Sequence, residues 1–218
     1  DQDSTSSKFA HEEIMDEFRS GKYNTLIGTQ MVAKGHDIPN VTLVGVLAAD
    51  SVLNLPDYRA SERAFSLLTQ AAGRAGRGNK AGQVVLQTYD ADNEIIKLAA
   101  KQDYDTFAKA ELFNRKNFYY PPYGQMLKLT TLDKNQAEAQ ALAQKVVLFL
   151  QNLVLEKKLP PMVISGPFPA LIAKIRDLYR YNVLIKAKDM GPVKAALMES
   201  EFRSVANLYF DVDPASVI

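Results

Sequence analysis

The stretch Gln70-Ala71-Ala72-Gly73-Arg74-Ala75-Gly76-Arg77-Gly78 places two arginines three residues apart, each directly after a glycine. It follows an amphipathic run from Arg59 to Leu68, which predicts a helix. On a helix end, this spacing would point both guanidinium groups the same way. Glycine has no side chain, so an anion can come close to the backbone, and a guanidinium binds two phosphate oxygens at once. The stretch therefore suggests a phosphate-binding turn.

The same residues also fit a simpler interpretation, a basic helix C-terminus capped by glycine, since arginine there complements the helix dipole. A dinucleotide-binding glycine loop fits poorly, because the glycines at 73, 76 and 78 follow a helical pattern rather than a strand. The residues alone leave the first two interpretations open.

The stretch matches Q-x-x-G-R-x-G-R, the sixth motif of superfamily 2 helicases, at Gln70, Gly73, Arg74, Gly76 and Arg77. In that family, the motif lies on the second of two RecA-like lobes and faces nucleotide bound on the first. The resemblance implies half of an ATP site here. It implies catalytic roles for Gln70, Arg74 and Arg77, with Gly73 and Gly76 beside the nucleotide.

A polar loop between two apolar segments precedes this motif. Thr25 to Gly28 predicts a short buried strand, and Val41 to Ala49 predicts a second one. Catalytic loops of α/β proteins lie at such strand ends. Asp50 then ends the second strand, and we interpret it as a strand terminus rather than a magnesium ligand. Ser51 follows it, where a helicase needs glutamate.

The loop itself, from Thr29 to Asp37, resembles the fifth motif of superfamily 2 helicases. The threonine of that motif meets a DNA phosphate, and its Gly-x-Asp lies at the nucleotide ribose. The resemblance implies DNA contacts for Thr29 and Gln30 and nucleotide contacts for Gly35 and Asp37. Without it, the same residues are ordinary turn residues followed by a glycine helix cap.

Strands and helices alternate through the first 118 residues, which predicts an α/β domain with a parallel sheet. Besides the two strands above, the pattern predicts a helix from Ser7 to about Gly21, a helix from Arg59, a strand from Gly82 to Tyr89, a helix from Asp92 to about Lys101, and a helix from Asp103 to about Phe118.

The segment Tyr119-Tyr120-Pro121-Pro122-Tyr123-Gly124 breaks this pattern, because paired prolines end a helix and stiffen the chain. It marks a boundary between a first domain, residues 1–118, and a second, residues 119–218. Its tyrosines could stack on bases, but packing between domains is the favoured interpretation.

The second domain has the order β-α-β-β-α-β, which predicts a small α+β domain of the split β-α-β type. The expected elements are a strand from Met126 to Thr131, a long helix capped by Asn135, a strand from Met162 to Ser165 that is interrupted at Gly166-Pro167-Phe168-Pro169 and continues from about Leu171 to Arg176, a strand from Arg180 to Ala187, a helix from Pro192 to Glu199, and a strand from Val205 to Asp211.

A basic and aromatic cluster falls on the predicted hairpin of this second domain. It comprises Lys174, Arg176, Tyr179, Arg180, Tyr181, Lys186 and Lys188, against one acid, Asp177. Such residues bind nucleic acid by phosphate attraction and base stacking. A solvated hairpin that charge protects from edge pairing explains them equally well.

The composition is that of a globular protein of 218 residues, which is long enough for two domains with cores of their own. The net charge of +1 argues against a strongly basic nucleic-acid binder, but residues 119–218 carry 12 Lys and Arg against 9 Asp and Glu, about +3. Cysteine is absent, which excludes disulfides and thiolate metal sites, and no apolar run reaches the length of a membrane span.

Short phrases along the whole chain resemble the PriA family of replication-restart DNA helicases, also called primosomal protein N′. They are Ile27-Gly28-Thr29-Gln30-Met31-Val32-Ala33-Lys34-Gly35-His36, Tyr58-Arg59-Ala60-Ser61-Glu62-Arg63, Pro121-Pro122, Ser165-Gly166-Pro167 and Asp211-Val212-Asp213-Pro214. The resemblance implies a bacterial, cytoplasmic, ATP-driven 3′-to-5′ helicase that acts on branched and single-stranded DNA. Primosome proteins and single-strand-binding proteins are the implied partners.

The resemblance also implies that some of the cofactor sites lie in other parts of a longer protein. ATP and magnesium would be shared with an upstream lobe, and zinc would be held by cysteines that lie outside these residues. The chain begins at Asp1, so we expect a C-terminal fragment that is inactive alone. Its last domain would resemble ribosomal protein S10 and bind DNA, with Lys174, Arg176, Tyr179 and Arg180 as candidate contacts.

Two functions remain: half of an ATP-driven helicase, or a DNA- or protein-binding module that merely keeps the fold. Arg74 and Arg77 favour the first, because an interaction-only module has no need of both arginines beside a Gly35-x-Asp37 loop.

Overall fold

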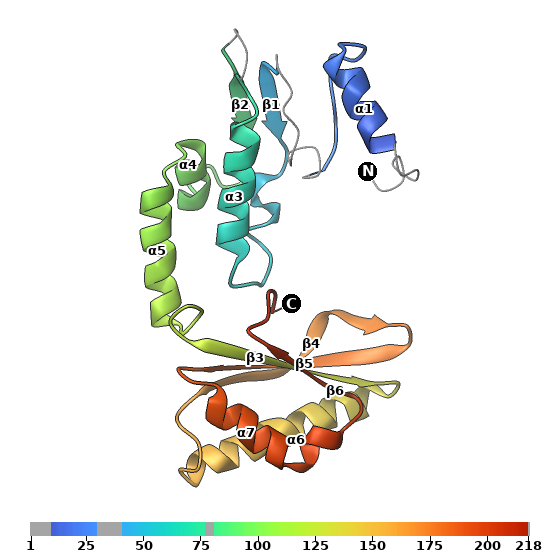
Figure 1. The fold of residues 1–218 in the computed structure, drawn as a ribbon, viewed down its shortest axis with the longest axis vertical. Coiled ribbons are helices and arrows are strands. Elements are labelled where there is room, and N and C mark those ends of the chain that lie inside the picture. Colours follow the sequence, from blue (N-terminus) through green and yellow to red (C-terminus); the bar gives the residue numbers. More distant parts are fainter. Residues whose placement is uncertain (1–9, 30–40, 77–80, 218) are drawn as a thin grey trace. The chain divides into compact units, whose positions relative to one another are not determined.

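The computed structural model describes residues 10–29, 41–76 and 81–217, and their chain forms two compact units (Figure 1). The first unit comprises Asp1–Leu55 and Arg59–Ala108, and the second comprises Pro56–Tyr58 and Lys109–Ile218. In the described ranges, no helix is both long and apolar enough to cross a membrane.

The first unit is a small α/β structure built around two parallel strands. Its elements are α1 (Ala10–Arg19), β1 (Leu43–Val46), the 3₁₀ helix η1 (Ala49–Ser51), α3 (Ala60–Ala72), β2 (Gln83–Leu86) and α4 (Glu94–Ala100). The next helix, α5 (Tyr104–Asn117), begins in this unit. The strands β1 and β2 pair in parallel with Val44 opposite Val84, so the predicted parallel sheet is confirmed for these two strands.

Apolar side chains of three helices form the core of this unit. Phe65 and Leu68 of α3 pack with Ile96 of α4 and Phe107 of α5. The rings of Phe65 and Phe107 stack with their centroids 4.2 Å apart. This packing fixes α3, which leads into the arginine motif, against the helices that follow it in the chain.

The predicted strand from Thr25 to Gly28 is wrong. These residues have no regular structure, and the Ile27 side chain is 88% exposed. A strand is held by hydrogen bonds to a neighbouring strand, and none of the described strands pairs with this segment. The strand predicted from Val41 to Ala49 is present but shorter, as β1, and the capping residue Ser7 lies outside the described residues.

The second unit is a four-stranded antiparallel sheet covered on one face by two helices (Figure 1). Its elements are β3 (Gln125–Asp133), α6 (Gln136–Leu155), β4 (Val163–Ile175), β5 (Leu178–Ala187), α7 (Gly191–Glu199), the 3₁₀ helix η2 (Glu201–Ser204) and β6 (Leu208–Val212). The strand order is β4-β5-β3-β6. This confirms the predicted β-α-β-β-α-β order and its split β-α-β arrangement.

The helix α6 begins after the predicted N-cap residue, Asn135. The Asn135 side chain accepts a hydrogen bond from the Ala137 backbone N–H at 2.9 Å and so satisfies one of the free donors at the helix start. Along the helix, Ala143, Val146 and Leu150 are buried against the sheet.

The predicted interruption of the fourth strand is only partly correct. β4 runs from Val163 to Ile175 as one strand, with register shifts between Ser165 and Phe168 and between Pro169 and Lys174. Proline and glycine are tolerated here because β4 is an edge strand, where a missing N–H removes no bond from the sheet interior.

Candidate functional site

The arginine motif begins on α3 but leaves the helix before its first arginine. The helix ends at Ala72, and Gly73 donates its N–H to Thr69 O at 3.0 Å. The Arg74 N–H then bonds to Ala71 O at 3.1 Å, which tightens the chain into a turn. Arg74 therefore lies in this turn rather than on the helix. Arg77 lies outside the described residues, so the common direction of the two guanidinium groups stays a prediction.

The turn formed by residues 73–76, here called the arginine turn, is tied to the start of β1. The Gly76 N–H donates to Val41 O at 3.0 Å, and Gly76 has φ +77, a conformation that favours glycine. Gly82 makes a close approach at the same place, because a Cβ on it would stand 2.2 Å from Gly76 N. Sequence reasoning missed this close approach of Gly82, and its only signal was the glycine at the first position of the predicted strand.

The bond from Gly76 reaches Val41, which lies four residues after Asp37 in the sequence and two residues before β1 begins. The arginine turn therefore lies at the start of β1. Gln30, Gly35 and Asp37 themselves lie outside the described residues, whereas Thr29 is described and exposed.

The side chains of the motif differ in exposure. Arg74 is half-buried, and Gln70 is exposed on the last turn of α3. The Gln70 Nε2 donates to the Ser66 hydroxyl at 3.2 Å, one helical turn back. The helix α3 therefore fixes the backbone of Gln70, and the hydrogen bonds of the arginine turn fix the backbone of Arg74.

At the opposite end of the strands, Asp50 has a structural role. Its carboxylate is buried and accepts hydrogen bonds from the Thr88 hydroxyl and, at 3.0 Å, from the Tyr89 N–H. These bonds, the one from Thr88 first, lower the pKa of Asp50. They join the segments that follow β1 and β2. The interpretation of Asp50 as a strand terminus is wrong in detail, because β1 ends at Val46 and Asp50 lies in the 3₁₀ helix η1.

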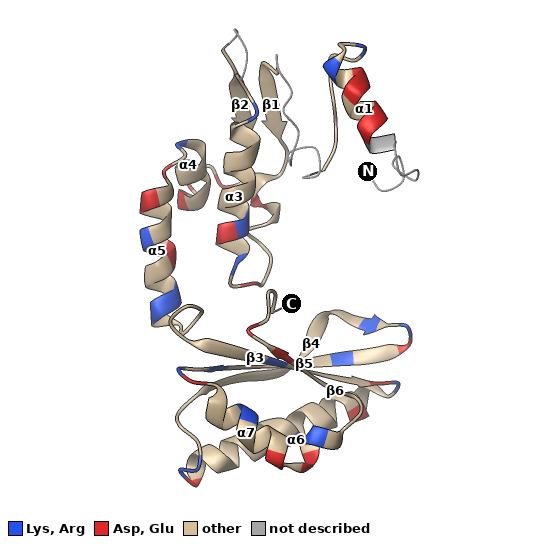
Figure 2. Ribbon diagram, viewed as in Figure 1, with Lys and Arg blue, Asp and Glu red and all other residues tan. Residues whose placement is uncertain are grey.

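The tip of the β4–β5 hairpin carries the candidate DNA-binding residues (Figure 2). Arg176 and Asp177 form the two-residue turn, both with positive φ (48 and 64) as in a type I′ hairpin. Lys174 lies opposite Tyr179 in the register, with its Nζ 5.0 Å from the ring centroid and 3.3 Å from Asp177 Oδ1. Lys174 and Arg176 are exposed.

The candidate residues of this hairpin do not share one face. Neighbouring residues of a strand point to opposite faces, so Tyr179 faces the side covered by the helices and Arg180 faces the other side. Tyr179 is half-buried against the main core. Tyr181, expected among the stacking residues, is instead 6% exposed, and its hydroxyl oxygen accepts a hydrogen bond from Gln136 Nε2 at 3.0 Å.

Two further members of the predicted basic cluster lie away from the tip. Lys186 is at the other end of β5, where its Nζ donates to Phe118 O at 3.0 Å, and Lys188 follows that end. The sequence places these lysines near the tip residues along the chain, but the eight residue steps from Leu178 to Lys186, at about 3.3 Å each, carry Lys186 about 26 Å along β5 from the turn. The exposed charge of the tip is therefore that of Lys174 and Arg176, offset in part by Asp177.

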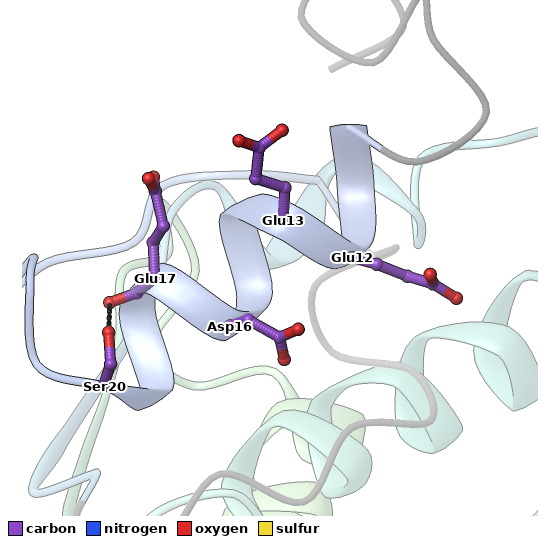
Figure 3. Close-up of a pocket in the computed structure, with 5 residues that line it drawn as sticks. All are labelled: Glu12, Glu13, Asp16, Glu17 and Ser20. Atoms are coloured by element: carbon purple, nitrogen blue, oxygen red, sulfur yellow. Dashed lines mark hydrogen bonds between the residues drawn. The ribbon is translucent and has the colours of Figure 1, made fainter.

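The helix α1 presents an acidic surface, lined by Glu12, Glu13, Asp16, Glu17 and Ser20 (Figure 3). Figure 3 shows the carboxylates diverging, with Glu13 and Glu17 on one side and Glu12 and Asp16 on another. Asp16 pairs with Arg19 at 2.9 Å, and Glu17 pairs with Lys22. Over the described part of the chain, no group of three or more histidine or acidic side chains is arranged to hold a metal ion.

Comparisons with known protein families match both units. Residues 3–79 match the helicase conserved C-terminal domain, and residues 116–215 match the primosomal protein N C-terminal domain. These ranges contain the arginine turn and the β4–β5 hairpin, respectively.

Several curated proteins with similar sequences carry the name replication restart protein PriA. The chain is 44% identical to that of Bacillus subtilis over 198 residues, which is 90% of this chain and 24% of the relative. It is 40% identical to that of Synechocystis over 220 residues, 100% of this chain and 26% of the relative. For Haemophilus influenzae the identity is 37% over 219 residues, 98% of this chain and 30% of the relative. The chain thus spans between about a quarter and a third of the length of these relatives.

Proposed function

Because the chain belongs to the PriA family of replication restart proteins, we propose that it supplies one half of the ATP site and a DNA-binding domain of an ATP-dependent DNA helicase. The observation that carries this proposal is the bond from Gly76 N–H to Val41 O. It holds the arginine turn at Val41, four residues after Asp37 in the sequence, and so supports a nucleotide site shared by the two motifs.

In this proposal, the first unit is the second RecA-like lobe of a superfamily 2 helicase. Arg74 and Arg77 direct their guanidinium groups toward the γ-phosphate, where negative charge develops as the phosphoryl group is transferred. Gln70 supports the same region from the last turn of α3. Gly35, Asp37, Gly73 and Gly76 form the nucleotide-facing backbone and the ribose contact.

The fit of this lobe to a nucleotide rests on its backbone. Glycines at 73 and 76 leave no side chain between the turn and an approaching phosphate. An upstream lobe would hold magnesium and the β-phosphate, so ATP and magnesium are cofactors of the two lobes together. Zinc would be bound outside this chain, because the chain has no cysteine.

The DNA contacts fall at two places. Thr29 and Gln30 would meet a DNA phosphate beside the ATP site. In the terminal domain, which we take as residues 119–218 with an S10-like fold, Lys174 and Arg176 would meet phosphates, and Tyr179 and Arg180 would extend the contact along both faces of β5. The first domain is then residues 1–118.

The whole protein would unwind DNA in the 3′-to-5′ direction at branched forks and on single strands in the bacterial cytoplasm. Primosome proteins and single-strand-binding proteins would be its partners. These roles depend on an upstream lobe, so the chain alone should have no ATPase activity and at most weak nucleotide binding.

ATPase activity tests this proposal directly. We would join the chain to the upstream region of the Bacillus subtilis relative, to give a two-lobe protein, and measure ATP hydrolysis with and without single-stranded DNA. The proposal predicts DNA-stimulated turnover by the two-lobe protein and none by the chain alone. DNA binding without turnover by the two-lobe protein would instead favour a non-catalytic interaction module. Turnover by the chain alone that co-elutes with it in gel filtration would contradict the divided site.

A further inference from the structure

The β4–β5 hairpin ends in a run of exposed residues, from Leu171 to Asp177. The run reads Leu-Ile-Ala-Lys-Ile-Arg-Asp, so large aliphatic side chains stand among charged ones. Leu171 is 61% exposed, Ile172 is 60% exposed and Ile175 is 40% exposed. A single exposed apolar residue is ordinary on a protein surface, but a group of three so close together is not. We call Leu171, Ile172 and Ile175 the aliphatic cluster.

The pairing of β4 with β5 explains why the first two residues of the aliphatic cluster are exposed. Pro169 lies opposite Tyr181, and Lys174 lies opposite Tyr179. The four residues of β4 at 170–173 therefore share a stretch in which β5 has only one residue. Such extra residues cannot all join the ladder, so the strand bulges and its side chains take new directions. Figure 1 shows β4 arching away from β5 before the turn.

The bulge is anchored to the second unit on both sides. Ala170, at its start, is only 4% exposed, so the chain is packed immediately before Leu171. Strand pairing resumes after the bulge, with Ile175 opposite Leu178. The aliphatic cluster is thus carried by backbone that is held at both ends.

An aliphatic cluster on a sheet edge is a liability unless something covers it. β4 is an edge strand, and an apolar edge can pair with other chains. Lys174 and Arg176 oppose such pairing by their charge. They do not explain the aliphatic side chains themselves, since polar residues in the bulge would keep the edge soluble. Exposed apolar patches rimmed by polar residues are typical of interaction sites.

The charges around the aliphatic cluster indicate the kind of ligand. Lys174 and Arg176 lie on either side of Ile175, and Arg180 lies on the stretch of β5 opposite the bulge. The single acid nearby in the sequence, Asp177, pairs with Lys174 at 3.3 Å, so the end of the hairpin keeps a net positive charge. A fitting ligand offers an apolar surface beside anionic groups. DNA does so, because every base has a flat face for stacking and every nucleotide carries a phosphate.

The form of the hairpin also suits DNA. The major groove of a duplex admits a two-stranded β-ribbon. Several DNA-bending proteins insert leucine or isoleucine side chains between base steps and so unstack them in part. This unstacking costs least where a strand is already unpaired. A ribbon that presents two adjacent aliphatic side chains therefore fits best where duplex DNA meets single-stranded DNA.

We propose that the aliphatic cluster is a wedge: Leu171 and Ile172 insert between bases at the junction of duplex and single-stranded DNA, while Lys174 and Arg176 contact the phosphates beside them. The inference rests on the proposed function and deepens it, because phosphate contacts alone have no need of aliphatic side chains. A wedge at this place would separate the two strands as ATP-driven movement draws DNA past it.

A forked DNA that carries 2-aminopurine at the junction tests the wedge in the 218-residue chain. Stacking quenches the fluorescence of this base analogue, so insertion should raise the fluorescence once the fork is saturated with protein. The same analogue placed inside the duplex should show no rise. Leu171→Gln with Ile172→Gln should lose the rise at the junction. Leu171→Met with Ile172→Met keeps apolar side chains and should retain it.

The matched control is Leu148→Gln with Leu155→Gln, which removes two exposed leucines from α6 of the same unit and should keep the rise. Fluorescence anisotropy adds a second readout. The glutamine variant of the wedge should lose about 3- to 10-fold in fork affinity, because part of the free energy of burying its aliphatic side chains is spent in unstacking bases. Its affinity for single-stranded DNA should fall less. The salt slope should stay parental, since apolar contacts release no counterions.

The inference is refuted if the parent binds the fork without raising the junction fluorescence, or if the glutamine variant of the wedge raises it as the parent does. Later elution of that variant in gel filtration, with parental junction fluorescence, would assign the aliphatic cluster to contacts between copies of the chain instead. A chain that binds neither forked nor single-stranded DNA would refute the proposed DNA contacts together with the wedge. Fork binding without the fluorescence rise would refute the wedge alone.

Discussion

Three glycines at the arginine turn differ in what an added methyl group would meet. On Gly73 it would make ordinary contacts at 3.5 and 3.6 Å, with φ at −68. On Gly76 it would require a left-handed conformation, which costs about 1–2 kcal/mol for a residue other than glycine. On Gly82 it would stand 2.2 Å from Gly76 N, so the backbone itself would have to move.

We therefore predict the stability order Gly73→Ala, then Gly76→Ala, then Gly82→Ala, from nearly parental to least stable. Gly73→Ala should change the free energy of unfolding by less than about 1 kcal/mol, because the helix end accepts alanine and the unfolded chain loses freedom. Urea unfolding of the chain, followed by far-UV circular dichroism, measures all three. Equal stability of Gly73→Ala and Gly82→Ala would contradict the close approach at this turn.

Asp50 should make the first unit sensitive to acid. Its pKa is lowered in the folded state by the hydrogen bonds from Thr88 and from the Tyr89 N–H. A lowered folded pKa means that the carboxylate stabilises the fold above its unfolded pKa of about 4, and that this contribution is lost as pH falls through the folded value.

The measurement is the thermal midpoint of the first unit from about pH 7 down to about pH 3, the range that spans the titration of a carboxyl group. Asp50→Asn should lower the midpoint at neutral pH and reduce the loss on acidification. Asp105→Asn, at an exposed position in α5, is the matched control and should follow the parent. An unchanged pH profile in Asp50→Asn would show that these hydrogen bonds contribute nothing to folding.

At the scale of elements, the β4–β5 hairpin makes a prediction about salt. If three or four of the candidate cations meet phosphates, log affinity for single-stranded DNA should fall against log salt with a slope of about −2 to −4. The variant Lys174→Gln with Arg176→Asn should flatten this slope by about one to two units. Asparagine suits position 176, because Arg176 has a positive φ.

The matched control removes two exposed lysines from the helices, Lys145→Gln with Lys194→Gln, which leaves the same net charge as the hairpin variant. Fluorescence anisotropy at several salt concentrations, on forked and single-stranded DNA, measures both variants in the complete 218-residue chain. If the hairpin variant and the control bind alike, the hairpin is a solvated edge and the DNA surface lies elsewhere.

The sequence predicted element boundaries that are set by contacts between residues close together in the chain. It did not predict boundaries that depend on which strands pair in the sheet. Asn135 could be identified as a cap because its bond to Ala137 spans two residues. The strand expected at Thr25–Gly28 failed because an apolar segment becomes a strand only beside a partner. β4 was expected to break at Gly166-Pro167, and only its edge position in the sheet explains why it continues.

The candidate site was predictable to a similar degree. The motif identified Arg74 and Gly76, but the end of α3 at Ala72 depends on the turn that follows it. The burial of Tyr181 follows from its register in the sheet, which the sequence does not state. The exposure of Leu171 and Ile172 follows from the bulge in the pairing of β4 with β5, so no local pattern indicates it.

At the scale of the whole molecule, the central claim is that two arginines on one lobe complete an ATP site whose other half lies upstream. The claim concerns rate rather than folding or DNA affinity. A guanidinium that meets charge developing on the γ-phosphate is worth about 10³-fold or more in turnover. Lysine does not replace it fully, because a point charge lacks the bidentate fork.

The most direct measurement is the DNA-stimulated ATPase rate of the two-lobe protein with Arg77→Ala, Arg77→Lys or Arg74→Ala, alongside the DNA affinity of each variant. The account predicts that both alanine variants lose about 10³-fold in turnover and bind DNA as the parent does, with only partial recovery in Arg77→Lys. Turnover close to the parental rate in both alanine variants would contradict the account.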